Sequence, residues 1–576
     1  MKRWYKYVKP YLSSFILGPL GMIVEVIGEM FMPLLLAELI NSANDGVLTV
    51  GKSIWLALGL IVIVLLMMSG GVAGAYFGSK ASVNFAADLR RDMYAKVQEY
   101  SFANIDKFST GSLVTRMTND VTQLQNFVNM LLRMALRSPG MFIGGIIMAV
   151  SLKPSLSVIL AVTMPLMLIT LFFLIRLGFP RFEKMQTRVD KLNSTVRENV
   201  TNVRVVKSFV REGYETEKYE RDNSASNNTA MSAVKVLIWS GPVMNIFMYV
   251  TVIAVIWSGH NIVLDGGMKV GDLSAFITYT TQILSSLMMV SMLFMFASRA
   301  IASGKRVCEV LDEKIDINDT NSSAELEISR GDIEFRNVSF RYYKNSEEAV
   351  LDNIDLTIKA GSTVGIIGST GCGKTTLVSM IPRLYDTDEG EVLIDGKNVR
   401  EYSLTHLRNG IGMVLQKNLL FSGTIGYNLR WGDEDASDGD IIRAASHSAA
   451  HKFVSTFAEG YDTVLDKGGM NLSGGQKQRL CIARALLKKP KILILDDSTS
   501  AVDTATEAQI REAFATDLPD CTKIIIAQRI SSVKDADQII VMNDGRITGV
   551  GTHDELLQNN EEYGEIYYSQ MDRKEA

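Results

Sequence analysis

Cysteine is scarce in this sequence, charged residues are few, and neither sign of charge dominates. Four cysteines occur in 576 residues, all in the C-terminal half and without the spacing of metal ligands. This excludes a small disulfide scaffold and fits a reducing, cytoplasmic compartment for that half. Charged residues make up only 21%, and 59 basic against 63 acidic side chains leave a net charge of −4. No strong basic field is present, so the sequence predicts no nucleic-acid partner.

Hydrophobic residues are abundant instead, at 47% of the chain, with a mean hydropathy of +0.13. This is too apolar for an ordinary soluble enzyme of this length. A helix needs about 20 apolar residues to cross a lipid bilayer. We therefore predict an α-helical transmembrane domain over residues 1–310, with six spans near 12–40, 53–77, 129–152, 155–178, 237–264 and 271–298.

The loops between these runs differ in length and in basic content. The short linkers after spans 1, 3 and 5 hold one basic residue each, whereas residues 78–128 hold six and residues 180–235 hold eleven. Because basic loops stay on the cytoplasmic side, we expect the N-terminus, both long linkers and the C-terminal half to be cytoplasmic. The first apolar run is expected to be an uncleaved span of a multi-pass protein of the plasma membrane.

Past a linker at 311–326, residues 327–576 show the alternating short strands and helices of an α/β nucleotide-binding domain. An apolar strand runs into a glycine-rich turn and then a helical segment. This is the context of a P-loop, in which backbone N–H groups surround phosphates, the lysine reaches the terminal oxygens and the following threonine binds Mg²⁺. The predicted phosphate-binding residues are Gly368, Ser369, Thr370, Gly371, Cys372, Gly373, Lys374, Thr375 and Thr376.

A second apolar strand, starting at Lys491, ends in two carboxylates, Asp496 and Asp497. A strand this apolar is typical of the centre of a parallel sheet. We predict that Asp496 holds the Mg²⁺ ion and that Asp497 orients or deprotonates the attacking water.

Between these two motifs lies Asn471-Leu-Ser-Gly-Gly-Gln-Lys-Gln-Arg479. Its core, Leu472 to Gln476, resembles the signature of ATP-binding-cassette (ABC) proteins, and with six spans ahead of it the whole chain resembles an exporter-type half-transporter. The resemblance implies ATP and Mg²⁺ as cofactors and a second half-transporter as partner, whose nucleotide is covered by this chain's signature. It also assigns adenine stacking to Tyr342, a contact to Mg²⁺ and the membrane domain to Gln416, nucleotide contacts to Ser473, Gly474, Gly475 and Gln476, and a cassette contact to Ser500–Asp503.

Two residues depart from the family pattern. The family usually has glutamate where this chain has Asp497, and histidine in the switch position where it has Gln528. Aspartate is one methylene shorter, and a glutamine amide carries neither a proton nor a positive charge. We therefore predict that Asp497, Gln528 and Gln416 form a degenerate catalytic set that binds ATP well and hydrolyses it poorly, in one subunit of a heterodimer. A homodimer with two slow sites remains the alternative.

The sequence indicates the transported substrate less clearly than it indicates the nucleotide site. Glu25 and Glu29 lie one turn apart in span 1, and Arg133 and Arg137 have a similar spacing near span 3, so these residues bind either each other or substrate. Methionines in spans 5 and 6 favour an amphipathic, drug-like substrate. A lipid or glycolipid flippase and a non-transporting ATP switch are the alternatives. By resemblance, residues 108–119 and 200–209 are expected to be coupling helices that dock on cassette grooves.

Overall fold

The computed structural model describes residues 2–319, 323, 325–344, 346, 348–497 and 504–575. These residues form two compact units. The first, called the helical unit, comprises Met1–Val97 and Gly111–Asp312. The second, called the cassette unit, comprises Gln98–Thr110 and Glu313–Ala576. The helical unit contains every apolar run predicted above.

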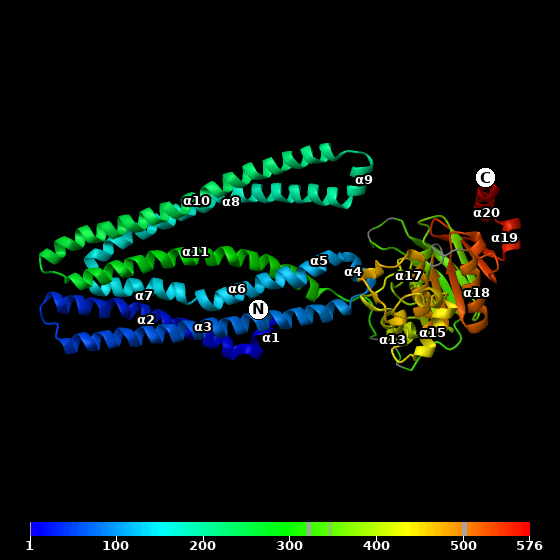
Figure 1. The fold of residues 1–576 in the computed structure, drawn as a ribbon, viewed down its shortest axis with the longest axis horizontal. Coiled ribbons are helices and arrows are strands. Elements are labelled where there is room, and N and C mark those ends of the chain that lie inside the picture. Colours follow the sequence, from blue (N-terminus) through cyan, green and yellow to red (C-terminus); the bar gives the residue numbers. More distant parts are fainter. Residues whose placement is uncertain are drawn as a thin grey trace. The chain divides into compact units, whose positions relative to one another are not determined.

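Five described helices of the helical unit, with 33 to 53 residues each, are longer than a bilayer is thick (Figure 1). The long apolar runs continue into charged segments rich in helix-forming residues, so that single helices leave the membrane without a break. The helices are α1 (Lys2–Val8), α2 (Leu12–Asn44), α3 (Val50–Gln98), α5 (Thr110–Thr115), α6 (Val121–Met134), α7 (Arg137–Leu152), α8 (Pro154–Thr201), α9 (Val203–Ser208), α10 (Glu212–Leu264) and α11 (Val270–Asp312), with a π-helical turn at Arg116–Asp120.

Within the described residues, five helical stretches are long and apolar enough to cross a membrane, namely Arg3–Asn44, Val50–Gln98, Thr110–Leu152, Pro154–Thr201 and Glu212–Leu264. The sixth predicted span, 271–298, falls on α11, which is a continuous helix of 43 residues. The number of spans therefore stays a prediction.

The third predicted span is not one straight helix. The chain turns at residues 135–136, between α6 and α7 (Figure 1). Pro139 lies in the first turn of α7, and because proline has no N–H it cannot bond the carbonyl of Ala135 four residues back. The apolar run at 129–152 signalled a span but could not show this break.

Helices α2 and α3 approach each other through glycines. A Cβ added to Gly21 would lie 2.6 Å from the carbonyl oxygen of Gly70 and 2.7 Å from the amide nitrogen of Gly74. A Cβ added to Gly70 would likewise lie 2.7 Å from the carbonyl oxygen of Gly21. Glycine spacing of this kind lets two membrane helices pack backbone against backbone, where dispersion contacts replace a hydrophobic driving force.

We therefore expect Gly21→Ala to destabilise the helical unit by about 1–3 kcal/mol, because the new methyl group must push the α3 backbone away. Thermal unfolding of the purified protein in detergent measures this effect. Gly51→Ala on α3 is the matched control, since a Cβ there meets no atom within 4 Å. Equal unfolding temperatures for the two variants would contradict the close packing.

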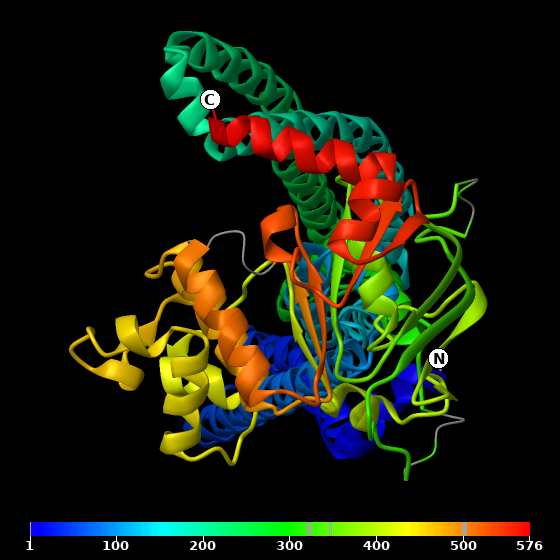
Figure 2. The same cartoon turned by 90° about the vertical axis from the view of Figure 1, so that its right-hand side faces the viewer.

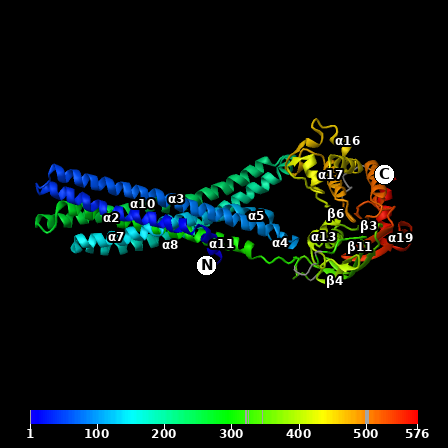
Figure 3. The same ribbon diagram turned by 90° about the horizontal axis from the view of Figure 1, so that it is seen from below.

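The described residues of the cassette unit form two larger sheets and a two-stranded antiparallel sheet of β7 and β8 (Figure 2, Figure 3). A six-stranded sheet has the order β12-β11-β3-β10-β9-β6 and is parallel except for β12, and an antiparallel sheet has the order β2-β1-β4-β5. The strands are β1 (Ile333–Phe340), β2 (Leu351–Ile358), β3 (Thr363–Gly368), β4 (Glu389–Ile394), β5 (Lys397–Asn398), β6 (Ile411–Val414), β7 (Gly423–Thr424), β8 (Val464–Leu465), β9 (Ile492–Asp496), β10 (Thr522–Ile526), β11 (Gln538–Asn543) and β12 (Arg546–Gly551).

Helices surround these strands, and the two motifs of the nucleotide site pack in different apolar clusters. The loop helix α12 packs with the antiparallel sheet through Leu377, whereas α17 packs in the other cluster through Leu480. The helices are α4 (Phe102–Lys107), α12 (Lys374–Met380), α13 (Leu404–Asn409), α14 (Ile425–Arg430), α15 (Asp438–His447), α16 (His451–Val454), α17 (Gly474–Leu487), α18 (Thr504–Asp517), α19 (His553–Asn559) and α20 (Glu561–Glu575).

Helix α4 corrects the predicted position of the first docking segment. The sequence placed that segment at 108–119, but the part of the chain that groups with the cassette unit is 98–110, and residues 111–119 belong to the helical unit. The reason is a capping box, in which Ser101 and Asn104 satisfy each other's backbone N–H groups and start a short helix earlier. The second short helix, α9, lies within the predicted segment 200–209.

Candidate nucleotide site

The phosphate-binding loop lies between the end of β3 and the start of α12. Gly371 and Gly373 have φ angles of +89° and +98°, which L side chains rarely adopt, and Gly373 precedes the first turn of α12. Ser369, Thr370 and Gly371 are exposed. Lys374 folds over the loop and donates hydrogen bonds to the carbonyls of Gly368 and Ser369 at 2.8 and 2.6 Å. The loop thus presents backbone N–H groups, a helix N-terminus and an ammonium group together, a donor set that fits polyphosphate.

Two of the three residues predicted to contact Mg²⁺, Thr375 and Asp496, lie side by side, and the third, Gln416, is described below. Thr375 Oγ1 is 3.1 and 3.0 Å from the two carboxylate oxygens of Asp496, although the residues are 121 positions apart in the chain. Burial raises the pKa of the Asp496 carboxyl, and the charge of Asp497 raises it further, while the bond from Thr375 acts in the opposite direction. A buried carboxylate beside a hydroxyl is an all-oxygen donor pair that suits Mg²⁺, which would neutralise this charge and that of the phosphates.

The three predicted catalytic residues also meet. Asp497 follows β9 with a left-handed φ of +48°, and its Oδ2 accepts a hydrogen bond of 2.7 Å from Gln528 Nε2. The Gln416 side chain also hydrogen bonds this carboxylate. Burial raises the pKa of the Asp497 carboxyl, and both glutamine amides act against that rise. The short carboxylate is therefore held between two neutral amides, and neither amide can accept a proton.

Tyr342 lies next to the loop helix. Its hydroxyl is 2.9 Å from Thr376 Oγ1 on α12, and its ring makes edge contacts with Phe340 and Tyr385. The side chain of Tyr342 is 43% exposed, which leaves ring surface for a stacking partner. Tyr385 in turn contacts α4, through its hydroxyl bond of 2.7 Å to Asp106 and its ring contact to Phe102. An aromatic chain thus connects α4 to the side of the phosphate loop.

The signature residues begin α17. Ser473 accepts a hydrogen bond from the backbone N–H of Gln476, and the Gln476 side chain accepts one from the backbone N–H of Ser473 at 2.8 Å. Leu472 is buried, whereas Ser473 and Gly474 are exposed, and Gly475 and Gln476 are half-buried. Among the residues described, no hydrogen bond connects this segment to the chain's own phosphate loop. The start of α17 offers exposed backbone N–H groups and a helix N-terminus, which suit an anion.

Comparisons with known proteins match both units. A family model described as the ABC transporter transmembrane region matches residues 15–287, and one described as ABC transporter matches residues 351–500. An ABC transporter ATP-binding protein of Bacillus subtilis (strain 168), YfiB, is 38% identical over 100% of this chain and 99% of its own length. The chain belongs to the ABC transporter family. A helical transmembrane domain followed by an ABC nucleotide-binding domain, the predicted fold class, is confirmed.

Two further relatives refine this ABC transporter assignment. An ATP-dependent lipid A-core flippase of Syntrophus aciditrophicus (strain SB) is 32% identical over 99% of this chain and 94% of its own length. The solved structure of a bacterial Atm1-family ABC exporter with ATP bound superposes with a TM-score of 0.78, at 26% identity over 98% of each chain. The chain is thus an exporter-type half-transporter with an ATPase domain.

Some features of this ABC transporter site were not identified from the sequence. Gln478, only 1% exposed, donates a bond of 3.4 Å to the backbone carbonyl of Asp497 and so supports the strained turn after β9. Gln478 lies inside the Asn471–Arg479 motif, but the motif alone did not indicate a role for its side chain. The contact of Tyr385 with α4 had no sequence signal. Ser500–Asp503, predicted to contact the second cassette, lie outside the described residues.

Proposed function

We propose that this chain is the degenerate-site subunit of a heterodimeric ABC exporter in the plasma membrane, with ATP and Mg²⁺ bound by the residues grouped above. The observation that carries the proposal is the Asp497–Gln528 pair, 2.7 Å apart in the position where the family has glutamate and histidine. Under this proposal residues 1–310 cross the membrane six times, and residues 327–576 and the N-terminus are cytoplasmic.

The catalytic deficit follows from the geometry of Asp497. Its side chain is one methylene shorter than that of glutamate, and its carboxylate already accepts hydrogen bonds from Gln416 and Gln528. Positioned general-base assistance contributes typically 10²–10⁴-fold to a rate. The phosphate loop keeps its lysine, glycines and Thr375, so ATP binding is retained while hydrolysis is slow.

The signature points to a partner with a competent site. Ser473, Gly474 and Gly475 are intact and carry an unaltered capping box with Gln476. We infer that the anion surface on α17 completes the nucleotide site of a second chain rather than that of its own loop. ATP held between two chains stabilises the closed pair, because each nucleotide contacts both. The link from α4 through Tyr385 to Tyr342 supports a route by which the membrane helices respond to closure.

The cargo we propose is a small amphipathic molecule. Methionines gather in one apolar cluster of the helical unit, and flexible thioethers repack around varied ligands. Lipid flipping is the second candidate, because the relative named as a lipid A-core flippase matches almost the whole chain.

The test is ATP turnover by this chain alone and by the chain copurified with its natural partner. We expect the homodimer to bind ATP and turn over at least about 10²-fold more slowly than the mixed pair, the lower limit of general-base assistance. Equal turnover by the homodimer would contradict the heterodimer. Stimulation of the mixed pair by lipid but not by amphipathic dyes would favour the flippase, and ATP-dependent dye uptake into inverted vesicles would favour the exporter.

A further inference from the structure

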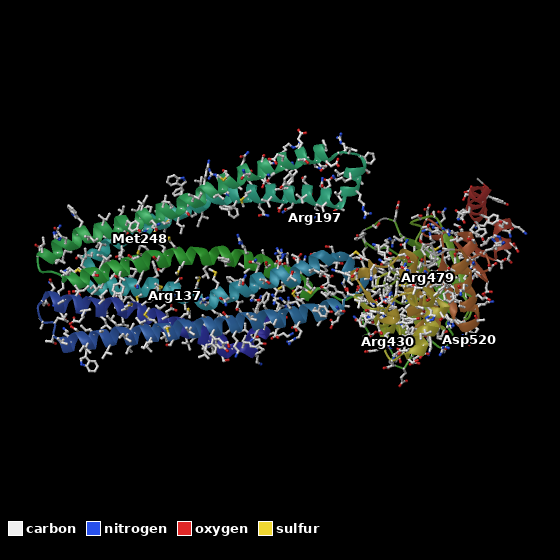
Figure 4. The ribbon with its side chains drawn as sticks, in the orientation of Figure 1. Arg137, Arg197, Met248, Arg430, Arg479 and Asp520 are labelled. Atoms are coloured by element: carbon white, nitrogen blue, oxygen red, sulfur yellow. The ribbon has the colours of Figure 1, made fainter. Side chains whose placement is uncertain are left out.

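Four charged and polar side chains from three helices of the helical unit form a cluster. Arg137 of α7, labelled in Figure 4, places its Nη2 atom 3.0 Å from Glu25 Oε1 and 2.7 Å from Glu29 Oε1 of α2. Gln282 of α11 donates a hydrogen bond of 3.4 Å to the backbone carbonyl of Glu29. The sequence left open whether the glutamates bind an arginine or substrate, and the structure shows that Arg137 contacts both.

This cluster is not a closed ion-pair network. Among the described residues, Glu29 Oε2 and Gln282 Oε1 are buried acceptors without a hydrogen-bond partner, and Arg137 Nε is a buried donor without one. A buried polar atom that lacks a partner is costly, and more so within a membrane domain. A purely structural salt bridge would be expected to satisfy these atoms.

The charge of the cluster indicates what kind of ligand it suits. One guanidinium faces two carboxylates, so with all three groups ionised the cluster carries one net negative charge. The two acceptors without partners, Glu29 Oε2 and Gln282 Oε1, require N–H or O–H donors. A ligand with one positive charge and its own N–H groups satisfies both conditions, whereas a quaternary ammonium offers charge without donors.

A cluster of apolar side chains includes other residues of α11, the helix that carries Gln282. Leu284, two residues on, is buried in a cluster to which methionines of three helices contribute, and Figure 4 labels one of them, Met248. Its methionines are Met164, Met167, Met244, Met248 and Met288. A charged cluster and a flexible apolar cluster that share α11 match the two ends of an amphipathic amine.

We propose that Glu29, with Glu25 and Gln282, binds the protonated amine of an amphipathic substrate, and that the methionine cluster holds the apolar body. This inference rests on the proposed export function and narrows its substrates to primary and secondary amines, whose protonated forms carry at least two N–H groups. Glu29 is the residue that contacts the amine, and Arg137 is a positioning residue that holds both carboxylates toward it.

The test compares three probes with the same dansyl body in the assembled transporter in nanodiscs. These are dansylcadaverine, which ends in a primary amine, its trimethylammonium analogue and its neutral acetamide. We expect the amine to bind best, and Glu29→Gln to weaken amine binding about 10–100-fold, the range of one charge-assisted hydrogen bond, without changing acetamide binding. Glu38→Gln on the same helix, whose carboxylate contacts Lys52 instead, is the matched control and should bind all three as wild type does.

Equal affinity of the wild type for the three probes, or an unchanged amine affinity in Glu29→Gln, would overturn the proposal. Should Glu29→Gln fail to fold, the Gln282→Met variant tests the proposal instead. It removes one hydrogen-bond acceptor and leaves the ion pairs in place. We expect its affinity for the amine probe to fall about 3–10-fold. Selective amine binding without ATP-driven transport of any probe or lipid would contradict the export function alone. Transport without amine selectivity would contradict this inference alone.

Discussion

Replacing Asp497 by glutamate and Gln528 by histidine together should raise ATP hydrolysis by the homodimer of this chain about 10²–10³-fold. The longer side chain carries the carboxylate away from the Gln416 amide and toward the attacking water. Histidine can donate a hydrogen bond to the terminal phosphate and can carry a positive charge. The rest of the site needs no change, because Lys374, Thr375 and Asp496 are already grouped. Turnover of purified homodimer in lipid, with ATP binding followed separately by a fluorescent analogue, measures the gain.

The single variants and one added substitution are the controls. Each single variant should recover only part of the gain, because the two side chains act on the same water and phosphate and their effects are not additive. Lys374→Ala in the double variant should remove the gain, which excludes a contaminating ATPase. If the double variant binds ATP with wild-type affinity yet turns over no faster, the slow step does not lie in Asp497 and Gln528.

The nucleotide site could be predicted closely because its motifs specify local geometry. A glycine-rich turn between an apolar strand and a helix can form only a few structures, and parallel strands bring their C-terminal ends to one edge of a sheet. Thr375 and Asp496 therefore meet, as do Asp497, Gln416 and Gln528. What these residues do in hydrolysis remains a prediction that the variants above test.

The parts that sequence reasoning missed depend on tertiary contacts between weakly patterned segments. Helix α4 is only six residues long, and its position follows from the Ser101 cap and from the bond between Asp106 and Tyr385, which lie 279 positions apart. Likewise, spacing on a helix showed that Arg133 and Arg137 could share a face, but only the packing of α2 against α7 selects Arg137 as the partner of the glutamates. Periodicity identifies faces, and packing decides which faces meet.

Gly474→Asp should reduce the turnover of a competent dimer at least about 10²-fold without changing nucleotide binding to the chain that carries it. The added carboxylate would stand at the N-terminus of α17, where the exposed Ser473 and Gly474 offer N–H groups to a phosphate, and it would repel the anion that this surface should stabilise in the transition state. Because Gly474 is exposed, the fold should be retained. The Asp497→Glu, Gln528→His homodimer is the background, since it needs no identified partner.

Mixed dimers decide whether the signature acts on its own chain or on the partner. In that background, one subunit carries Lys374→Ala and the other Gly474→Asp, each with a different affinity tag so that only mixed dimers are purified. If the signature completes the partner's site, one site receives both defects and the other receives neither, and about half of the parent turnover should remain. If the signature acted on its own chain, each subunit would hold one defective site and turnover would vanish. The second outcome would contradict the heterodimer proposal, since an intact signature could then contribute nothing to a partner.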